Sequence, residues 1–133
     1  MTISVLVLTL NEEANLAACL SALSWSDDIM VLDSFSTDQT TELAKRLGAR
    51  VIQRKFDSFA GQRNYALDTV NFKYDWILHI DADEVVTPAL QREMFEAIRS
   101  ERLDAYRIPS KTMFFGRWLR FSGMYPTYQV RLG

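Results

Sequence analysis

The sequence predicts an α/β fold in which a mainly parallel sheet carries helices on both faces. Short apolar runs, of the length of buried strands, alternate with longer segments in which apolar residues recur every three or four positions. This alternation is typical of parallel strands joined by crossover helices. The chain has 133 residues, of which 48% are hydrophobic and 24% charged, which suffices for one globular domain with a sizeable core.

The chain is expected to begin with a strand and a helix. Residues Ile3–Thr9 are apolar and mostly β-branched, and the run is too short for a helix, so they predict a fully buried strand. A helix is expected over about 14–23, with an apolar stripe made of Leu16, Cys19, Leu20 and Leu23. Because Cys19 is the only cysteine, an intrachain disulfide is excluded, and its place in the stripe predicts a packing role.

A second strand and helix follow. Residues 28–32 have the pattern of a strand, which Asp33 and Ser34 stop. The side chains of 36–38, a Ser-Thr-Asp run, can cap a helix that extends to about Leu47. Gly48 is expected just past its end, where glycine adopts the left-handed conformation most easily.

Two more strand–helix units complete the alternation. A short strand at Arg50–Gln53 precedes a helix that Ser58 can cap and that extends to about Val70. The residues of this helix that are available to face inward are Phe59, Ala66, Leu67 and Val70. Residues 76–80 predict a buried strand, and Thr87 and Pro88 then open a helix as its cap and first residue. Its inward residues are Leu90, Met94 and Ile98.

The pattern changes after residue 100, where strand-like runs at 105–109, 111–115 and 128–132 predict a β-extension. Basic and aromatic residues are interleaved there. This predicts arginine stems packed on aromatic rings, a surface for an anionic acceptor or a lipid headgroup, or both. Because the last strand pattern stops at Gly133, the sequence predicts an incomplete domain.

Polar residues follow three of the expected strands at the points where they end. These are the segments Thr9-Leu10-Asn11-Glu12, Asp33-Ser34 and Asp81-Ala82-Asp83. The carboxyl ends of parallel strands meet at one edge of a sheet, and ligands bind beyond that edge. We therefore expect a binding site where the three segments come together.

Asp81 and Asp83, spaced one residue apart after the last parallel strand, could hold a divalent cation through oxygen ligands. Mg²⁺ or Mn²⁺ would complete its coordination with phosphate oxygens of a substrate. The alternative is an acidic turn that stops the strand and caps the next helix. Neither a Walker sequence nor a GxGxxG motif supports the site, and Arg63 could add positive charge near it.

Three other polar residues have open or different interpretations. Asp33 could accept an N–H from a nucleobase or could cap the loop that follows it. His79 lies within an apolar strand pattern, which favours a core histidine over a ligand. Glu84 is close in sequence to the acid pair, but we do not expect it to be the catalytic base.

Four segments occur in the order found in one enzyme family: VLVLTLNEEANLAACLSAL, DIMVLDSFSTDQTTELA, FAGQRNYAL and WILHIDADEVV. Over about 3–132 the chain resembles the nucleotide-binding half of a family 2 glycosyltransferase of GT-A fold. It is most similar to bacterial enzymes that add glucose or a related sugar to lipopolysaccharide core and other envelope glycans. The resemblance implies a Rossmann-like α/β/α sandwich, with 1–100 as the nucleotide-sugar-binding core and 101–133 as a β-extension on the acceptor side.

The resemblance also implies roles for individual residues. Those carried over to the nucleotide-sugar site are Thr9, Asn11, Glu12, Asp33, Arg63, Asp81, Ala82 and Asp83. The first four would contact the nucleoside, and Arg63 would lie near the base and phosphates. Asp81 would lie toward the ribose and Asp83 toward a Mn²⁺ or Mg²⁺ ion. The reaction would be an inverting, metal-dependent transfer of a hexose from a nucleotide-diphosphate sugar, most simply a UDP-sugar, to a glycan or glycolipid.

The sequence departs from the family in two ways. The family's Gly-Trp-Tyr-Pro-Asp segment is Gly-Met-Tyr-Pro-Thr at 123–127, which puts acceptor contacts near it in doubt. Such enzymes are also longer, and their catalytic base usually lies beyond the point that corresponds to Gly133, so no catalytic residue is assigned. An inverting transfer needs a carboxylate within hydrogen-bond reach of the acceptor hydroxyl.

Two alternatives remain open at this point. The run from Ile80 to Val85 also meets the motif of a haloacid-dehalogenase-type phosphatase, with Asp81 as nucleophile and Asp83 as general acid and base. That motif normally opens its domain, whereas three strand–helix units precede it here. The other alternative is a non-catalytic nucleotide-sugar-binding fragment.

Composition limits the partners and the location. The net charge of −2 argues against a general nucleic-acid binder. The apolar start lacks the basic flank of a signal peptide, and no apolar run approaches the roughly 20 residues of a membrane span. We expect a cytoplasmic protein that contacts the inner face of the membrane, if at all, through the basic and aromatic residues near its C-terminus.

Overall fold

The structure is a computed structural model that describes residues 3–99, 106–109 and 128–132. The expected strand at 111–115 and the segment 123–127 lie outside these residues. The described elements are β1 (Ile3–Thr9), α1 (Glu13–Ser21), β2 (Ile29–Asp33), α2 (Thr40–Arg46), β3 (Arg50–Gln53), α3 (Phe59–Thr69), β4 (Trp76–Asp81), α4 (Pro88–Arg99), β5 (Tyr106–Pro109) and β6 (Tyr128–Leu132). The expected α/β fold is confirmed.

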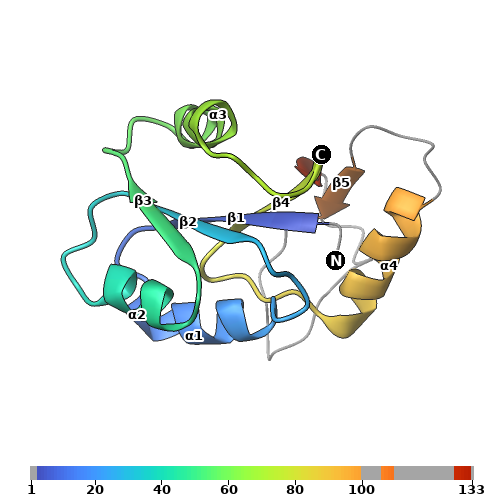
Figure 1. The fold of residues 1–133 in the computed structure, drawn as a ribbon, viewed down its shortest axis with the longest axis horizontal. Helices are drawn as coiled ribbons and strands as arrows, with labels where there is room; N and C mark the ends of the chain where they lie inside the picture. The colour runs from blue at the N-terminus through green and yellow to red at the C-terminus, as the bar shows by residue number, and fades with distance from the viewer. Residues whose placement is uncertain (1–2, 100–105, 110–127, 133) are drawn as a thin grey trace.

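The strands form one sheet in the order β3-β2-β1-β4-β6-β5 (Figure 1). β3, β2, β1 and β4 are parallel, whereas β6 runs antiparallel to both β4 and β5. In the register, Thr9 lies beside Asp33 and Leu8 lies beside Asp81. The ends of β1, β2 and β4 therefore meet at one edge, as the polar segments predicted.

The two faces of the sheet bury different side chains because successive residues of a strand point to opposite sides. Val5 and Val7 of β1 pack in a cluster with residues of α1, α2 and α4, whereas Leu6 packs in a second cluster with Ala66 of α3. Figure 1 shows α1 and α2 on one side of the sheet and α3 on the other. The expected layering of helices on both faces is confirmed.

Three of the expected helix ends are confirmed. Ser58 Oγ accepts the N–H of Gly61 at 2.9 Å at the start of α3, and Thr87 Oγ1 accepts the N–H of Leu90 at 3.1 Å before α4. Gly48 follows α2 with a φ of 93°, in the left-handed region that glycine adopts without a steric penalty.

The expected capping of α2 by 36–38 is right for Asp38 and wrong for Ser36 and Thr37. The helix begins at Thr40, whose N–H donates to Asp38 Oδ1 at 3.0 Å, and the side chain of the N-cap residue Gln39 makes no capping hydrogen bond. The hydroxyl and N–H of Ser36 instead bond to Asp33, and the N–H of Thr37 donates to Asn11 Oδ1 at 2.8 Å. The chain therefore remains a loop for several residues before the helix starts.

The expected inward face of α3 is only half right. Ala66 is fully buried and Val70 packs against the second cluster. Phe59 and Leu67, by contrast, are 58% and 45% exposed, and the buried polar residue of the helix is Gln62. Of the four residues expected to face inward, only Ala66 and Val70 therefore pack against the sheet.

Two buried residues have the packing roles that the sequence predicted. Cys19 is fully buried in the larger cluster, and His79 is a buried residue of β4. Burial, followed by the nearby acids beginning with Glu84, raises the pKa of the Cys19 thiol to about 12. The thiol is therefore protonated and unreactive at neutral pH.

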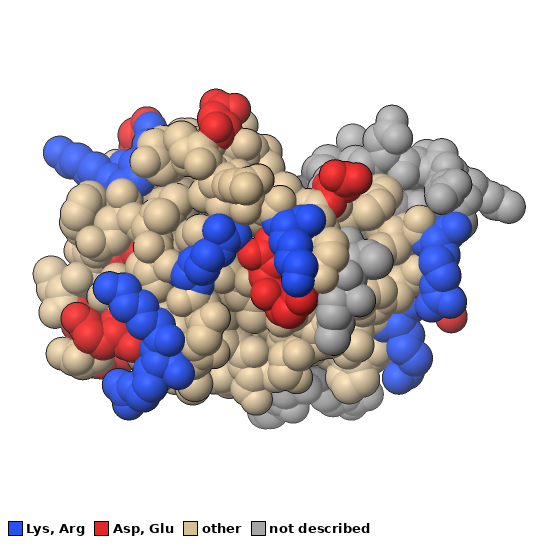
Figure 2. All heavy atoms as spheres, in the orientation of Figure 1, with Lys and Arg blue, Asp and Glu red and all other residues tan. Residues whose placement is uncertain are grey.

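The surface and the helices add two observations on partners. On the face shown in Figure 2, Lys and Arg side chains of the described residues are spread among acidic and uncharged ones, without a continuous basic patch. Of the helices in the described ranges, none is both long enough and apolar enough to cross a bilayer.

Candidate functional site

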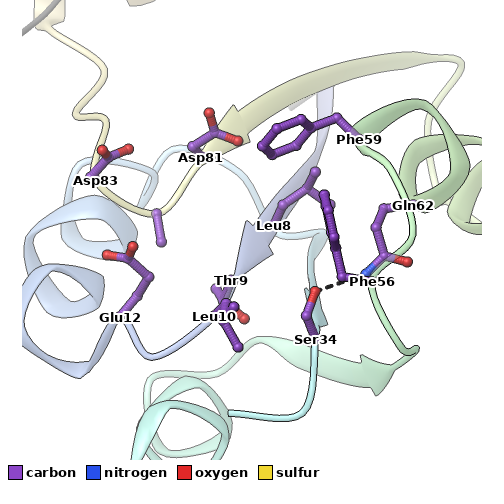
Figure 3. Close-up of a pocket in the computed structure, with 11 residues that line it drawn as sticks. Leu8, Thr9, Leu10, Glu12, Ser34, Phe56, Phe59, Gln62, Asp81 and Asp83 are labelled. Carbon is purple, nitrogen blue, oxygen red and sulfur yellow. Dashed lines mark hydrogen bonds between the residues drawn. The ribbon is translucent and has the colours of Figure 1, made fainter.

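A cavity of about 370 Å³ opens at the edge where the parallel strands end (Figure 3). It is lined by the ends of β1 and β4, by Ser34 after β2, and by residues in and before α3. The lining residues are Leu8, Thr9, Leu10, Glu12, Ser34, Phe56, Phe59, Gln62, Asp81, Ala82 and Asp83. Five of the predicted site residues thus line one cavity: Thr9, Glu12, Asp81, Ala82 and Asp83.

The acidic end of the cavity is formed by Asp81, Asp83 and Glu12. Asp81 is the last residue of β4, and Figure 3 shows its carboxylate together with those of Asp83 and Glu12 around the cavity. Glu84 does not line the cavity, and its Oε1 accepts the N–H of Asp81 at 2.8 Å. That bond fixes the turn that carries the acid pair, and the expectation that Glu84 is not the base stays a prediction.

The acids suit a hard cation but do not form a complete cage for one. Within the described ranges, no group of three or more His, Cys, Asp or Glu side chains is placed to hold a metal ion. Two carboxylates that face a cavity leave coordination positions for water and for a ligand's phosphate oxygens, which is the usual way in which Mg²⁺ is bound. The donor set therefore fits a metal that binds together with an anionic ligand.

Asp33 is fully buried and is engaged with protein groups on both oxygens. Its Oδ1 accepts the hydroxyls of Thr9 at 2.7 Å and Ser36 at 2.5 Å, and its Oδ2 accepts the N–H of Ser36 at 2.7 Å and the amide of Gln53 at 3.2 Å. Burial raises the pKa of this carboxyl, but the hydrogen bonds from Ser36, Thr9 and Gln53 outweigh it, and the pKa lies below its ordinary value. Asp33 caps the loop, and its contact with a nucleobase stays a prediction.

Asn11 also holds this loop and does not line the cavity. Its backbone has a φ of 52°, its N–H donates to Ser36 Oγ at 2.8 Å, and its Oδ1 accepts the N–H of Thr37 at 2.8 Å. Asparagine tolerates this left-handed conformation better than most residues. The reciprocal bonds fix the chain that leads into Glu12, so Asn11 affects the cavity through the position of its neighbour.

Arg63 is set back from the cavity. Its guanidinium lies over the ring of Phe59, 5.9 Å from the centroid, and Phe59 itself is a lining residue. The predicted contact of Arg63 with base and phosphates therefore stays a prediction.

Six lining residues were not predicted as site residues from the sequence. They are Leu8, Leu10, Ser34, Phe56, Phe59 and the buried Gln62, which precedes Arg63 in α3. Gln62 Nε2 donates to Ser34 Oγ at 3.0 Å and to the carbonyl of Arg54 at 3.1 Å. The available signal was the polar Gln62 on the strip of α3 that faces the sheet. Nothing local marked Phe56 as a wall residue.

Comparison with known sequences identifies relatives of the chain. Residues 4–129 match the Glycosyl transferase family 2. An uncharacterized glycosyltransferase of Rickettsia typhi is 38% identical over 119 residues, which are 86% of this chain and 40% of that protein. The lipopolysaccharide core biosynthesis glycosyltransferase LpsC of Rhizobium meliloti is 29% identical over 122 residues, 87% of this chain and 44% of that protein. The chain thus spans less than half the length of these relatives.

Solved structures show the same fold. Staphylococcus aureus TarS 1-349 in complex with UDP-GlcNAc superposes with a TM-score of 0.70 and 25% identity, over 90% of this chain and 37% of that one. Glucosyl-3-phosphoglycerate synthase of Mycobacterium tuberculosis, in complex with Mn²⁺, UDP and glucosyl-3-phosphoglycerate, gives a TM-score of 0.51 and 30% identity over 61% and 33% of the two chains. With its sequence match, its GT-A-like α/β sheet and its acid-lined cavity at the strand ends, the chain belongs to family 2 of the glycosyltransferases.

Proposed function

We propose that this protein is an inverting, divalent-metal-dependent hexosyltransferase. It takes the hexose from a nucleotide-diphosphate sugar, a UDP-sugar, and transfers it to a glycan or glycolipid acceptor in cell-envelope polysaccharide synthesis. The observation that carries the proposal is the cavity at the carboxyl edge of the sheet, which Asp81 and Asp83 face. Its volume of about 370 Å³ is within the range of small-molecule sites.

The relatives support the choice of donor, metal and acceptor. TarS is solved with UDP-GlcNAc, and the mycobacterial synthase with Mn²⁺ and UDP. LpsC is a lipopolysaccharide core biosynthesis glycosyltransferase. We extend the UDP-sugar, the Mn²⁺ or Mg²⁺ ion and the envelope acceptor to this protein on that basis. The acceptor would be reached at the cytoplasmic face of the membrane.

The residues of the chain have separable tasks in this proposal. Asp81 and Asp83 would hold the metal, which when bound offsets the negative charge that develops on the departing diphosphate. The hydrogen bond that the Asp81 N–H donates to the Glu84 carboxylate keeps the acid pair in place. The base that removes the acceptor proton is not assigned to any of the described residues that line the cavity.

One other candidate function has an observation in its favour. The same cavity and acid pair would serve to bind a nucleotide sugar without transferring it, since no catalytic base is assigned among the described residues. Catalysed release of UDP from a UDP-sugar would separate the enzyme from the binding fragment. The phosphatase alternative has no such support, since residues 4–129 match a glycosyltransferase family.

The test is Asp83→Asn, measured by titration calorimetry with UDP in the presence and absence of Mn²⁺. The wild-type protein is expected to bind UDP more tightly with Mn²⁺, and the variant is expected to lose that increase because an amide is a much poorer ligand for a hard cation. Glu42→Gln, which removes an exposed carboxylate on α2, is the matched control and should behave as wild type.

Two outcomes would contradict the proposal in different ways. Unchanged Mn²⁺-dependent binding in Asp83→Asn would remove the metal role from this residue. A wild-type protein that binds none of UDP, GDP, TDP and ADP, with or without Mn²⁺, would contradict the donor assignment itself.

A further inference from the structure

The cavity has two ends of different chemistry. Asp81, Asp83 and Glu12 give one end a high density of negative charge, whereas Phe56 and Phe59 form an aromatic wall elsewhere in the lining (Figure 3). A nucleotide sugar has the same division, because its anionic diphosphate needs a metal and its base is a flat aromatic ring. The two chemistries lie on one continuous cavity surface.

Phe56 and Phe59 are more exposed than phenylalanines usually are. Their exposed fractions are 43% and 58%, and the rings meet edge to face with centroids 5.2 Å apart and planes at 74°. Large apolar side chains are normally buried, and an exposed group of them at a cavity indicates a binding surface. Because the rings are nearly perpendicular, a flat ligand can lie on the face of one ring while it contacts the other.

The loop that carries Phe56 is fixed by hydrogen bonds of Arg54 and Asp57, which flank Phe56 in the sequence. Arg54 makes a two-pronged ion pair with Asp57, from Nη1 to Oδ1 at 3.0 Å and from Nη2 to Oδ2 at 3.1 Å. Arg54 also donates to Gln62 Oε1 at 2.8 Å, which ties the loop to α3. Asp57 Oδ1 accepts the N–H of Ser58 at 2.6 Å. The aromatic wall is therefore positioned before any ligand arrives, which lowers the entropy cost of binding.

The amide of Gln62, at this end of the cavity, is already engaged within the protein on both its oxygen and its nitrogen. Gln62 donates to Ser34 and to the Arg54 carbonyl and accepts from the Arg54 guanidinium. Arg63 lies over Phe59 without lining the cavity. What this end offers to a ligand is therefore mainly the ring surface of Phe56 and Phe59.

We propose that Phe56 and Phe59 form the wall against which the nucleobase of the donor stacks, so that its diphosphate extends toward Asp81 and Asp83. This inference rests on the proposed function and deepens it, since it assigns the base to two residues, Phe56 and Phe59, for which the family resemblance implied no role. Stacking on aromatic side chains is a general way of holding a base, because every base presents a flat face.

The test measures the affinity of the full chain for UDP and for inorganic pyrophosphate, both with Mn²⁺, by titration calorimetry. Phe56→Ala and Phe59→Ala are each expected to weaken UDP binding about tenfold, the loss typical of one stacking contact. The pyrophosphate affinity should stay at the wild-type value, because pyrophosphate has no base. Phe59→Tyr, which keeps the ring, should bind UDP as wild type does.

Leu67→Ala is the matched control, because it truncates another exposed apolar residue of α3 that does not line the cavity. It should leave both affinities unchanged, and thermal unfolding should show that each variant is folded. Unchanged UDP affinity in both alanine variants would overturn the stacking wall and leave the proposed function standing. Equal losses for UDP and pyrophosphate would also overturn it, by showing a structural role. No UDP binding by the wild-type protein would contradict the donor assignment together with this inference.

Discussion

Asp33 remains ionised although it is fully buried, because every donor around it points at its oxygens. Burial of an unpaired carboxylate is costly, but Thr9, Ser36 and Gln53 together supply the bonds that replace its water shell. Hydrogen bonds to an ionised group are stronger than neutral ones. The same bonds join β1, β2, β3 and the loop after β2. Asp33 thus fixes the relative positions of these segments next to the cavity.

Asp33→Asn is expected to lower the free energy of unfolding by about 2–3 kcal/mol, since the amide presents a donor to groups that are themselves donors. Urea denaturation measures the loss. Asp68→Asn on the exposed side of α3 is the control and should be close to wild type. An unchanged free energy of unfolding in Asp33→Asn would show that these hydrogen bonds add nothing to stability.

Because the pKa of Asp33 is lowered in the folded protein, the stability of the fold depends on pH. A carboxyl whose pKa is lower in the folded protein than in the unfolded chain stabilises the fold above its unfolded pKa, which is about 3.9. That stabilisation is lost as the pH falls through the folded value. Urea titrations across the acid range should therefore show a steeper loss of stability in wild type than in Asp33→Asn, and parallel curves would contradict this role.

At the scale of elements, the strands were predictable and several contacts of the loops were not. The bounds of β1 and β3 agree with the sequence because each apolar run has a clear beginning and end. Of the three residues expected to cap α2, only Asp38 bonds to its first turn. Ser36 and Thr37 bond instead to Asp33 and to Asn11, the latter 25 residues or more away in the chain. Local patterns contain no information about such a partner.

In the candidate site, too, some residues could be predicted from the sequence and others could not. The acid pair and Thr9 could be assigned because polar residues at strand ends must lie at the sheet edge. The aromatic wall could not, because Phe59 has the apolar character of a core residue, and only the angle between α3 and the sheet decides that it faces the cavity. Tertiary packing decides such cases, and helical spacing alone does not.

Ser58 is the element-scale residue on which the aromatic wall depends most directly. Ser58→Ala removes the hydroxyl that accepts the Gly61 N–H and should cost about 1 kcal/mol of stability. Amide hydrogen exchange should be faster in the first turn of α3, next to Phe59, than in the rest of the helix. Ser58→Asn keeps a capping oxygen, so its stability and its exchange rates in the first turn should equal those of wild type. If Ser58→Ala changed the exchange rates equally along all of α3, the role of Ser58 as a local cap would be contradicted.

At the scale of the whole molecule, the two edges of the parallel sheet have different tasks. The carboxyl edge carries the cavity, and the amino edge carries a second buried acid, Asp28, which is 6% exposed. Asp28 accepts the hydroxyl of Ser4 at 2.6 Å, the guanidinium of Arg50 at 2.7 Å and the N–H of Lys73 at 2.7 Å. These bonds join β1, β3 and the connection into β4 to the residue just before β2, at the amino edge of the sheet.

Asp28→Ala should therefore lower stability without changing ligand affinity. The expected loss in the free energy of unfolding is about 2–4 kcal/mol, because the buried hydroxyl of Ser4 and the N–H of Lys73 lose their acceptor. The affinity for UDP with Mn²⁺, measured where the variant is still folded, should equal that of wild type. Asp27→Ala, which removes the exposed neighbour that pairs with Lys73 at 2.5 Å, should change neither quantity appreciably. A loss of UDP affinity in Asp28→Ala would show that the amino edge is coupled to the cavity through β1, and the separation of tasks between the two edges would then be wrong.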